Sequence, residues 1–458
     1  MHFNKPLQLV FILSIWLMSG VGCDETTTPA GVLSSQKVSD TAGNFEGVLE
    51  DNDQFGSAIA TIGDLEVDGV IDLAVGTPLD DDGGTDRGAV WILFMNDDGT
   101  VDIAQKISDT EGTFLGLLED SDQFGSAVAE LGDLDGDGFL DIAVGAPMDD
   151  DGGTDHGAVW ILFLNADGTV RFTQKISEAE GGFTGILEDN DQMGGALANI
   201  GDLNNDGIPE IAVGARLDDD GGGDRGAIWI LFLTRSGTVL GVQKISDTDG
   251  DFEGTLLDGD YFGSSIAGIG DLDLDGIEDV AVGAIGDDDG GTDRGAVWIL
   301  LMNIDGTVRL EQKLSAVNGN FNGGLTDGNH FGSSVVGLGD FNGDGINDIV
   351  AGADLDDDGG IDRGAVWLLF METDGTINSE TKISSTTGNF TGPLTDGTRF
   401  GSAVANIGDL DRDADATTDI TVGAKLDDDG GIDRGAVWTL FMKPSVTEID
   451  LNPFDNQE

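Results

Sequence analysis

The sequence predicts an all-β fold built from six copies of one four-stranded unit. The first observation behind this prediction is a 69-residue period that recurs six times. The glycine of an F-G-S-A-type segment marks the period, at Gly56, Gly125, Gly194, Gly263, Gly332 and Gly401. The second observation is that each unit contains four short runs of β type, separated by turns rich in Gly and Asp. A fixed period of this kind indicates one supersecondary unit copied into an array.

The second unit shows how the four runs are graded in size. Its strands are expected at 126–129, 142–145, 158–163 and 169–177. The first run holds small residues and the third holds Trp160 with bulky apolar neighbours, which describes a wedge. Continuous apolar runs indicate strands that are covered on both faces, and neighbouring units would supply that cover. Six wedges arranged radially make a six-bladed β-propeller of four-stranded blades.

The phase of the array predicts how the ring closes. The repeat region begins with a lone fourth strand at 36–39 and ends with a lone third strand at 436–442. The N-terminal strand is therefore expected to complete the last blade. This arrangement leaves no half-blade with an open edge.

The two ends of the chain lie outside the array. Residues 1–22 read as a signal peptide of lipoprotein type, with a short apolar run that ends just before Cys23. We expect Cys23 to be lipidated; the alternative is ordinary signal cleavage with an incidental cysteine. The division expected from these features is a tether at 23–35, the propeller at 36–443 and a polar acidic tail at 444–458. The predicted location is the cell envelope or surface.

The charge excludes two classes of partner. The chain has 20 Lys and Arg against 88 Asp and Glu, a formal net charge of −68. Such a surface repels nucleic acid and anionic lipid, so contact with a membrane is expected only through a lipid anchor. Because Cys23 is the sole cysteine, disulfides are unavailable, and the fold depends on its core, on bound ions or on both. Adaptation to a saline habitat is an alternative source of some of this acidity.

The acids recur at fixed places, and the first place has the spacing of a cation site. Between the first and second strands, five units read D-x-[DNE]-x-D-G-x-x-[DE]; we call these segments metal loops. Oxygen ligands at positions 1, 3, 5 and 9, with Gly at position 6 for the turn, suit Ca²⁺ and not zinc or copper. The expected ligands are Asp64, Glu66, Asp68 and Asp72; Asp133, Asp135, Asp137 and Asp141; Asp202, Asn204, Asp206 and Glu210; Asp271, Asp273, Asp275 and Asp279; and Asp340, Asn342, Asp344 and Asp348.

The metal loop of the sixth unit departs from this pattern. Asp409, Asp411 and Asp413 keep the first three ligand positions, but Ala414 replaces the turn glycine. Two extra residues move the closing acid to Asp419. Whether this loop holds an ion stays open.

These motifs resemble a known family. The order F-G-S-A-V-A, G-D-L-D-G-D-G-F-L-D-I-A-V-G-A-P and G-A-V-W-I-L-F resembles the FG-GAP repeat of integrin α-subunit propellers, over residues 36–442. The resemblance implies a calcium-binding propeller used for extracellular recognition or adhesion. Integrin propellers have seven repeats, whereas this chain has six, and the Pro of G-A-P survives only at Pro78 and Pro147.

Every unit has a second acidic segment, D-D-D-G-G-x-D-R-G, between its second and third strands; we call these the DDDGG loops. They can be a further cation site or a binding rim, or they can be neutralised internally, with Arg87 and its equivalents beside the Asp residues. His156 replaces the arginine in the second unit. A third acidic stretch, such as 50–53, precedes each F-G pair, and we call it the pre-FG stretch.

Catalytic motifs are missing from the sequence. There are three His, and no nucleophile elbow or cofactor-binding glycine motif is found. The six repeat Trp residues are expected to pack between blades. The favoured function is an exported, monomeric, calcium-binding module for recognition or adhesion, with a protein or glycan partner at the cell surface. One alternative is a structural subunit of an envelope complex in which calcium only stabilises; another is an enzyme that uses the propeller rim.

Overall fold

The computed structural model describes residues 25–28, 30–413 and 417–449. The chain separates into two compact units, each considered by itself. One contains β1 (Glu25–Thr28), which pairs antiparallel with β26 (Val446–Ile449). The other, Ala30–Pro444, contains six four-stranded antiparallel sheets. The predicted signal peptide and Cys23 lie outside the described residues.

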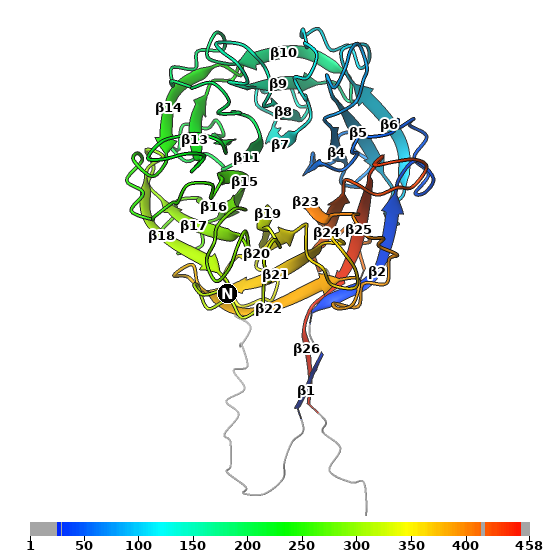
Figure 1. Ribbon diagram of the computed structural model, residues 1–458. Helices are drawn as coiled ribbons and strands as arrows, with labels where there is room; N and C mark the ends of the chain where they lie inside the picture. The colour runs from blue at the N-terminus through cyan, green and yellow to red at the C-terminus, as the bar shows by residue number, and fades with distance from the viewer. Residues whose placement is uncertain (1–24, 29, 414–416, 450–458) are drawn as a thin grey trace, which may run out of the picture. The chain divides into compact units, whose positions relative to one another are not determined.

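The six sheets are the blades of a β-propeller, as predicted (Figure 1). The first strands are β3 (Ala58–Thr61), β7 (Ala127–Gly132), β11 (Ala196–Asn199), β15 (Phe262–Gly270), β19 (Phe331–Gly339) and β23 (Phe400–Gly408). The second strands are β4 (Leu73–Thr77), β8 (Asp141–Ala146), β12 (Ile211–Ala215), β16 (Asp279–Ala284), β20 (Asp348–Ala353) and β24 (Asp419–Ala424).

The bulkier strands follow in each blade. The third strands are β5 (Ala89–Met95), β9 (Ala158–Leu164), β13 (Ala227–Leu233), β17 (Ala296–Met302), β21 (Ala365–Met371) and β25 (Ala436–Lys443). The fourth strands are β6 (Val101–Ile107), β10 (Val170–Ile176), β14 (Val239–Ile245), β18 (Val308–Ser315), β22 (Ile377–Ser384) and β2 (Gly31–Val38). Among the described residues no helix occurs.

The ring closes through its two ends, which confirms the prediction. The strand order of the last blade is β2-β25-β24-β23, so the N-terminal strand is its outer strand. Lys37 pairs with Trp438 in this sheet, as Lys106 pairs with Trp91 in the first blade. β2 begins at Gly31, so residues 31–35, expected to be part of a tether, belong to the blade. The reason is packing, because Val32 pairs with Met442 and lies buried in the core.

The F-G pair joins each blade to the one before it. Phe55 is fully buried, and its backbone forms a parallel bridge to Gly435 of the neighbouring blade. Gly56 has a φ of 90°, and a Cβ there would lie 2.6 Å from the carbonyl oxygen of Ala436. Only glycine fits such a close approach of two backbones. This contact explains why the glycine recurs with the repeat.

The core lies between neighbouring blades. Each apolar cluster combines strands of two blades; one of them unites Val90 and Phe94 of the first blade with Val144 and Trp160 of the second. The ring of Trp91 meets that of Phe45 edge-on, with centroids 5.0 Å apart. Equivalent Phe–Trp contacts occur at the other five tryptophans. The repeat tryptophans are thus blade-packing residues, and the core fixes the loops at both ends of every blade.

Candidate metal loops and DDDGG loops

The metal loops are curled by their own first aspartate. In the second blade, Asp133 accepts hydrogen bonds from the backbone N–H groups of Asp137 and Gly138, both at 2.9 Å. Asp137 in turn accepts the N–H of Phe139 at 2.9 Å. Gly138 has a φ of 95°, the conformation that the turn glycine was expected to supply. The same bonds form in the first, third and fourth blades, so the loop shape follows from the local sequence.

The closing acid of each metal loop begins the second strand or directly precedes it, and is buried. Asp141 is fully buried, and it accepts the N–H groups of Leu134 at 3.0 Å and Leu164 at 3.3 Å. Burial raises its pKa to about 7 although these hydrogen bonds oppose the shift, and Asp135 and Asp137 raise it further. Burial likewise raises the pKa to about 7 in Asp72, Glu210, Asp279 and Asp419, and to about 6 in Asp348. A nearby cation would favour the charged form of all six groups.

Four of the six metal loops bring three carboxylates together. In each of them one oxygen from every member lies within 4.8 Å of the others. The groups are Asp133, Asp135 and Asp141; Asp202, Asp206 and Glu210; Asp271, Asp273 and Asp279; and Asp409, Asp411 and Asp413. The sixth loop, which the sequence left open, is therefore among those that converge, although Ala414 itself lies outside the described residues. Asp419 is not in its group, but accepts the N–H of Leu410 at 3.0 Å, as Asp141 does from Leu134.

The remaining expected ligands are placed differently. Among the described residues no such group forms around Asp64, Glu66, Asp68 and Asp72, or around Asp340, Asp344 and Asp348. In the fifth blade Asn342 donates to Asp344 at 2.9 Å, and in the third Asn204 donates to Glu210 at 2.9 Å. Asp137 and Asp275 face arginines instead of joining the triads.

Two metal loops hold a cation that the chain itself supplies. Arg171 forms ion pairs with Asp135 and with Asp137, the latter at 2.7 Å. Arg309 pairs in the same way with Asp273 and Asp275 in the fourth blade. The equivalent outer-strand position holds Asp102, Leu240 and Asn378 in the first, third and fifth blades. The sequence interpretation missed these arginines, although their 36-residue offset from Asp135 and Asp273 was visible.

The donor set of the converging loops fits a hard divalent cation. The oxygen-bearing side chains that approach one another there are carboxylates, with the amide of Asn204 beside them in the third blade, the chemistry that Ca²⁺ and Mg²⁺ prefer. Each loop also contains a buried acid whose pKa is raised, so that a neighbouring positive charge would stabilise it. The third blade offers the clearest case, since its loop combines Asp202, Asp206 and Glu210 and no arginine occupies the position of Arg171.

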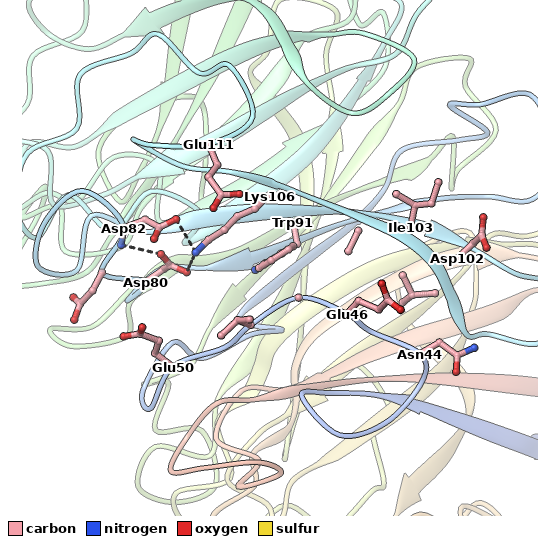
Figure 2. A pocket seen from close by; sticks show the side chains of 15 residues that line it. Asn44, Glu46, Glu50, Asp80, Asp82, Trp91, Asp102, Ile103, Lys106 and Glu111 are labelled. Atoms are coloured by element: carbon pink, nitrogen blue, oxygen red, sulfur yellow. Dashed lines mark hydrogen bonds and ion pairs between the residues drawn. The ribbon is translucent and has the colours of Figure 1, made fainter.

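The DDDGG loops are neutralised by lysine. In the first blade Lys106 lies between Asp80, at 2.6 Å, and Asp82, at 2.8 Å (Figure 2). Its Nζ atom is also 5.5 Å from the ring centroid of Trp91. The same contacts recur in every blade through the other lysines of the repeat, Lys37, Lys175, Lys244, Lys313 and Lys382. The side chains of Lys106 and Asp80 are 9% and 3% exposed, so these ion pairs form a layer beneath the surface of the loop.

The arginine of each DDDGG loop reaches beyond its own loop. Arg87 pairs with Asp109, after the fourth strand, at 2.8 Å, and with Asp120 of the next pre-FG stretch at 3.0 Å. His156 makes the equivalent contacts in the second blade, 2.7 Å to Glu178 and 3.3 Å to Asp189. Internal neutralisation, one of the two readings left open by the sequence, therefore describes these loops. The arginines were expected beside the aspartates of their own loop, whereas lysine takes that place.

The pre-FG stretch adds a buried acid beside this layer. Asp53 accepts the N–H of Glu50 at 2.8 Å, and burial together with the charge of Asp80 raises its pKa to about 7 against that hydrogen bond. Asp122, Asp191 and Asp260 are the equivalents in the next three blades. In the fifth blade Asn329 stands at this position and donates to Asp356 at 2.9 Å. A protonated aspartate at this position can donate the same kind of hydrogen bond that the neutral amide of Asn329 donates.

Acidic hollows lie beside these layers at the outer strands of three blades. In the first blade a cavity of about 560 Å³ is lined by Glu46, Glu50, Asp102, Trp91 and Lys106, among others (Figure 2). Related cavities of about 530 and 420 Å³ lie beside Trp160 and Trp229. Carboxylates dominate their walls, which favours cationic or hydroxyl-bearing groups.

Comparison with known proteins agrees with the repeat pattern. The FG-GAP repeat family model matches residues 124–162, 193–231 and 331–369. The chain is 36% identical to human integrin alpha-11 over 169 residues, 36% of this chain and 12% of that protein. It is 35% identical to chicken integrin alpha-6 over 164 residues, 36% of this chain and 14% of that protein.

A longer match, 31% identical over 263 residues, is to integrin alpha pat-2 of Caenorhabditis elegans. It covers 54% of this chain and 19% of that protein, so the chain spans less than a fifth of these relatives. The chain thus carries FG-GAP repeats, and its sequence is similar to segments of integrin α-subunits.

Proposed function

We propose that the protein is an exported, calcium-binding FG-GAP propeller that acts as a recognition or adhesion module at the cell surface. The observation that carries the proposal is the set of converging carboxylate loops at one end of a ring whose units are similar to integrin α-subunits. Calcium in these loops would bind through Asp133, Asp202, Asp271 and their loop partners. It would supply positive charge that neutralises the buried closing acids and stiffens the loops.

Attachment to the cell is the second part of the proposal. No helix in the described part of the chain is long and apolar enough to cross a membrane. We propose a lipid on Cys23, after removal of residues 1–22, as the anchor. The partner would be a protein or glycan, because the acidic hollows beside Trp91, Trp160 and Trp229 suit basic or hydroxyl-bearing groups. The molecule is proposed to act as a monomer.

Two other functions compete with this one. In a structural subunit of an envelope complex, the same calcium loops would only stabilise the ring. An enzyme would use carboxylates of the rim for acid–base chemistry. Against the enzyme, the DDDGG carboxylates are already held in ion pairs with Lys106, Arg87 and their equivalents. The similarity to integrin α-subunits favours recognition over both.

Calorimetric titration of Ca²⁺ into chelator-stripped protein tests the metal sites. Extracellular calcium sites typically bind at roughly 10⁻⁴ to 10⁻³ M. At 100 times the dissociation constant, each site would add about 2.7 kcal/mol to the free energy of unfolding. We expect several ions to bind and the melting temperature to rise. Replacing Asp202 and Asp206 by Asn should remove one ion.

The matched control is a double variant that removes two negative charges at the other end of the same blade. Asp219→Asn combined with Asp224→Asn alters the DDDGG loop of the same blade and should leave the number of bound ions unchanged. Equal loss in both double variants, or a melting temperature that responds to bulk salt and not to calcium, would reject the metal sites.

Recognition is tested separately, by binding of the purified mature protein to intact cells and to immobilised glycans. A recognition module should bind saturably, and chelation should weaken the binding. Co-purification with envelope proteins at fixed stoichiometry, without binding to cells or glycans, would instead establish the structural subunit.

A further inference from the structure

The first strands of the six blades surround a channel along the axis of the ring. Serines line one end of this axial channel. A cavity of about 110 Å³ lies there, where the first strands begin, lined by Ser57, Ser126, Ser264 and Ser402 among others. This volume is several times the roughly 30 Å³ that a water molecule occupies in the liquid. Ser333, also in the lining, accepts the N–H of Asp354 at 3.2 Å, and Ser402 accepts that of Lys425 at 3.4 Å. The backbones of Asp354 and Lys425 therefore contact two of the serines that line the cavity.

The residues around this opening break the symmetry of the repeat. Two positions of each unit contribute: the residue after the second strand and the residue before the F-G pair. The first position holds Pro78, Pro147, Arg216, Ile285, Asp354 and Lys425. The second holds Gln54, Gln123, Gln192, Tyr261, His330 and Arg399. The first, second and fourth blades are uncharged here, whereas three cations, an imidazole and one acid come from the third, fifth and sixth.

The single acid of this cluster is surrounded by cations. The side chain of Asp354 is 5% exposed, with Arg399 at 3.6 Å and Lys425 at 4.0 Å from its Oδ2 atom. Nδ1 of His330 is 3.7 Å from Oδ1. These distances are too long for hydrogen bonds, and Oδ1 has no hydrogen-bond partner among the described residues. The carboxylate of Asp354 thus faces two cations and an imidazole at distances too long for a hydrogen bond to any of them.

The directions of the pKa shifts show that positive charge exceeds negative charge in this cluster. Burial alone would raise the pKa of Asp354, but His330, Lys425 and Arg399 together lower it. Burial lowers the pKa of Lys425, and the charges of Arg399 and Arg216 lower it further, against the attraction of Asp354. This excess of positive charge occurs in a chain whose net charge is −68, in which three of the 20 Lys and Arg gather at one opening.

Other cations of the chain are placed in the opposite way. Lys106 has two carboxylates, at 2.6 and 2.8 Å, and Arg87 has two, at 2.8 and 3.0 Å. The other end of the axial channel holds Glu130 and Glu278, whose pKa burial raises. A cationic opening is thus a local feature of this end and not a general property of the axis.

We propose that this opening binds an oxyanion, the carboxylate, sulfate or phosphate group of a ligand. Arg399 and Lys425 supply the charge, and Arg216 stands beside them with its guanidinium 3.2 Å from the amide oxygen of Gln192. Charge-assisted hydrogen bonds are strong where solvent is partly excluded. The site is separate from the metal loops, which lie at the other end of every blade, and does not depend on calcium.

The test is a titration of the full mature protein with sodium sulfate, phosphate and acetate, with chloride used to match ionic strength. The ring resonances of His330 report binding, and those of His156, on the DDDGG loops, serve as an internal control. We expect saturable shifts at His330 alone, with and without chelator. Arg399→Gln combined with Lys425→Gln should weaken binding by at least about tenfold, the loss expected for one charged hydrogen bond.

Arg235→Gln is the matched control, because its guanidinium bonds the carbonyl of Gly207 in a metal loop. This variant should bind the anions as the wild type does. Preference for acetate would assign a carboxylate ligand, and preference for sulfate or phosphate would assign a tetrahedral one. Shifts that do not saturate, that appear equally at His156, or that survive in the double variant would overturn the proposal. Melting curves of each variant verify that the ring is intact.

Discussion

The metal loops and the DDDGG loops carry similar acidity but differ in how far the chain itself supplies their counter-ions. In the DDDGG loop of the first blade, Lys106 is fixed between Asp80 and Asp82 by the outer strand. In the metal loop of the third blade, Asp202, Asp206 and Glu210 converge without any such partner. Acidity alone therefore does not identify an ion site. What matters is whether the fold brings a cationic side chain to the carboxylates.

The second and fourth blades are intermediate between these two cases. Their metal loops converge, yet Arg171 and Arg309 reach in from the outer strand and pair with two carboxylates each. The arginines are partly exposed, so they hold the loops less firmly than the buried lysines hold the DDDGG aspartates. The comparison predicts graded effects, in which buried pairs matter more than exposed ones.

The largest effect is expected from removal of a lysine of the DDDGG layer. Lys106→Met leaves Asp80 buried without its partner, which should lower the free energy of unfolding by about 3 kcal/mol. Because the chain supplies this cation, the loss should be the same with calcium and with chelator. Urea denaturation under both conditions measures it. A loss that disappears on adding calcium would show that the DDDGG loops also bind the ion.

A smaller effect, dependent on pH, is expected at the pre-FG acid. Burial raises the pKa of folded Asp53 to about 7 from an ordinary 3.8, so the folded state keeps a proton that the unfolded state has lost. The free energy of unfolding therefore falls as the pH rises from about 4 to 7. Asp53→Asn, which copies Asn329 of the fifth blade, should add about 2 kcal/mol at pH 7.5 and almost nothing at pH 4.

Thermal unfolding at the two pH values measures this difference. The reverse change, Asn329→Asp, should introduce a pH dependence of the same sign in the fifth blade. An Asp53→Asn variant that is equally stabilised at both pH values would indicate better packing instead of relief of a buried charge.

The smallest effect is expected where arginine competes with the ion. Arg171→Gln frees Asp135 and Asp137, and should raise the calcium affinity of the second loop by about threefold, the size expected for a partly exposed ion pair. Calorimetry on the variant measures the change, with Arg87→Gln, which removes an arginine from a DDDGG loop, as the control. An unchanged or weaker affinity would mean that Arg171 orders the loop more than it competes.

The sequence predicted the elements of this protein more successfully than the pairing of its charges. The strand positions, the wedge order and the closure by the N-terminal strand all follow from patterns inside one unit, and they are confirmed. The strand bounds shift by a few residues, as in β7, which begins at Ala127 and continues to Gly132. The partners of Arg87 were missed because Asp120 belongs to the next unit, 33 residues along the chain.

The amino-acid sequence by itself determined the period, the blade, and the oxygen donors of each metal loop, because these depend on residues close together in the chain. Tertiary structure decided which acids are neutralised by a cationic side chain and which are left without one. It also assembled the cationic opening, since Asp354 comes from the fifth unit and Arg399 and Lys425 from the sixth. A closed ring brings equivalent positions of all blades around one axis, so differences scattered along the sequence become neighbours in space.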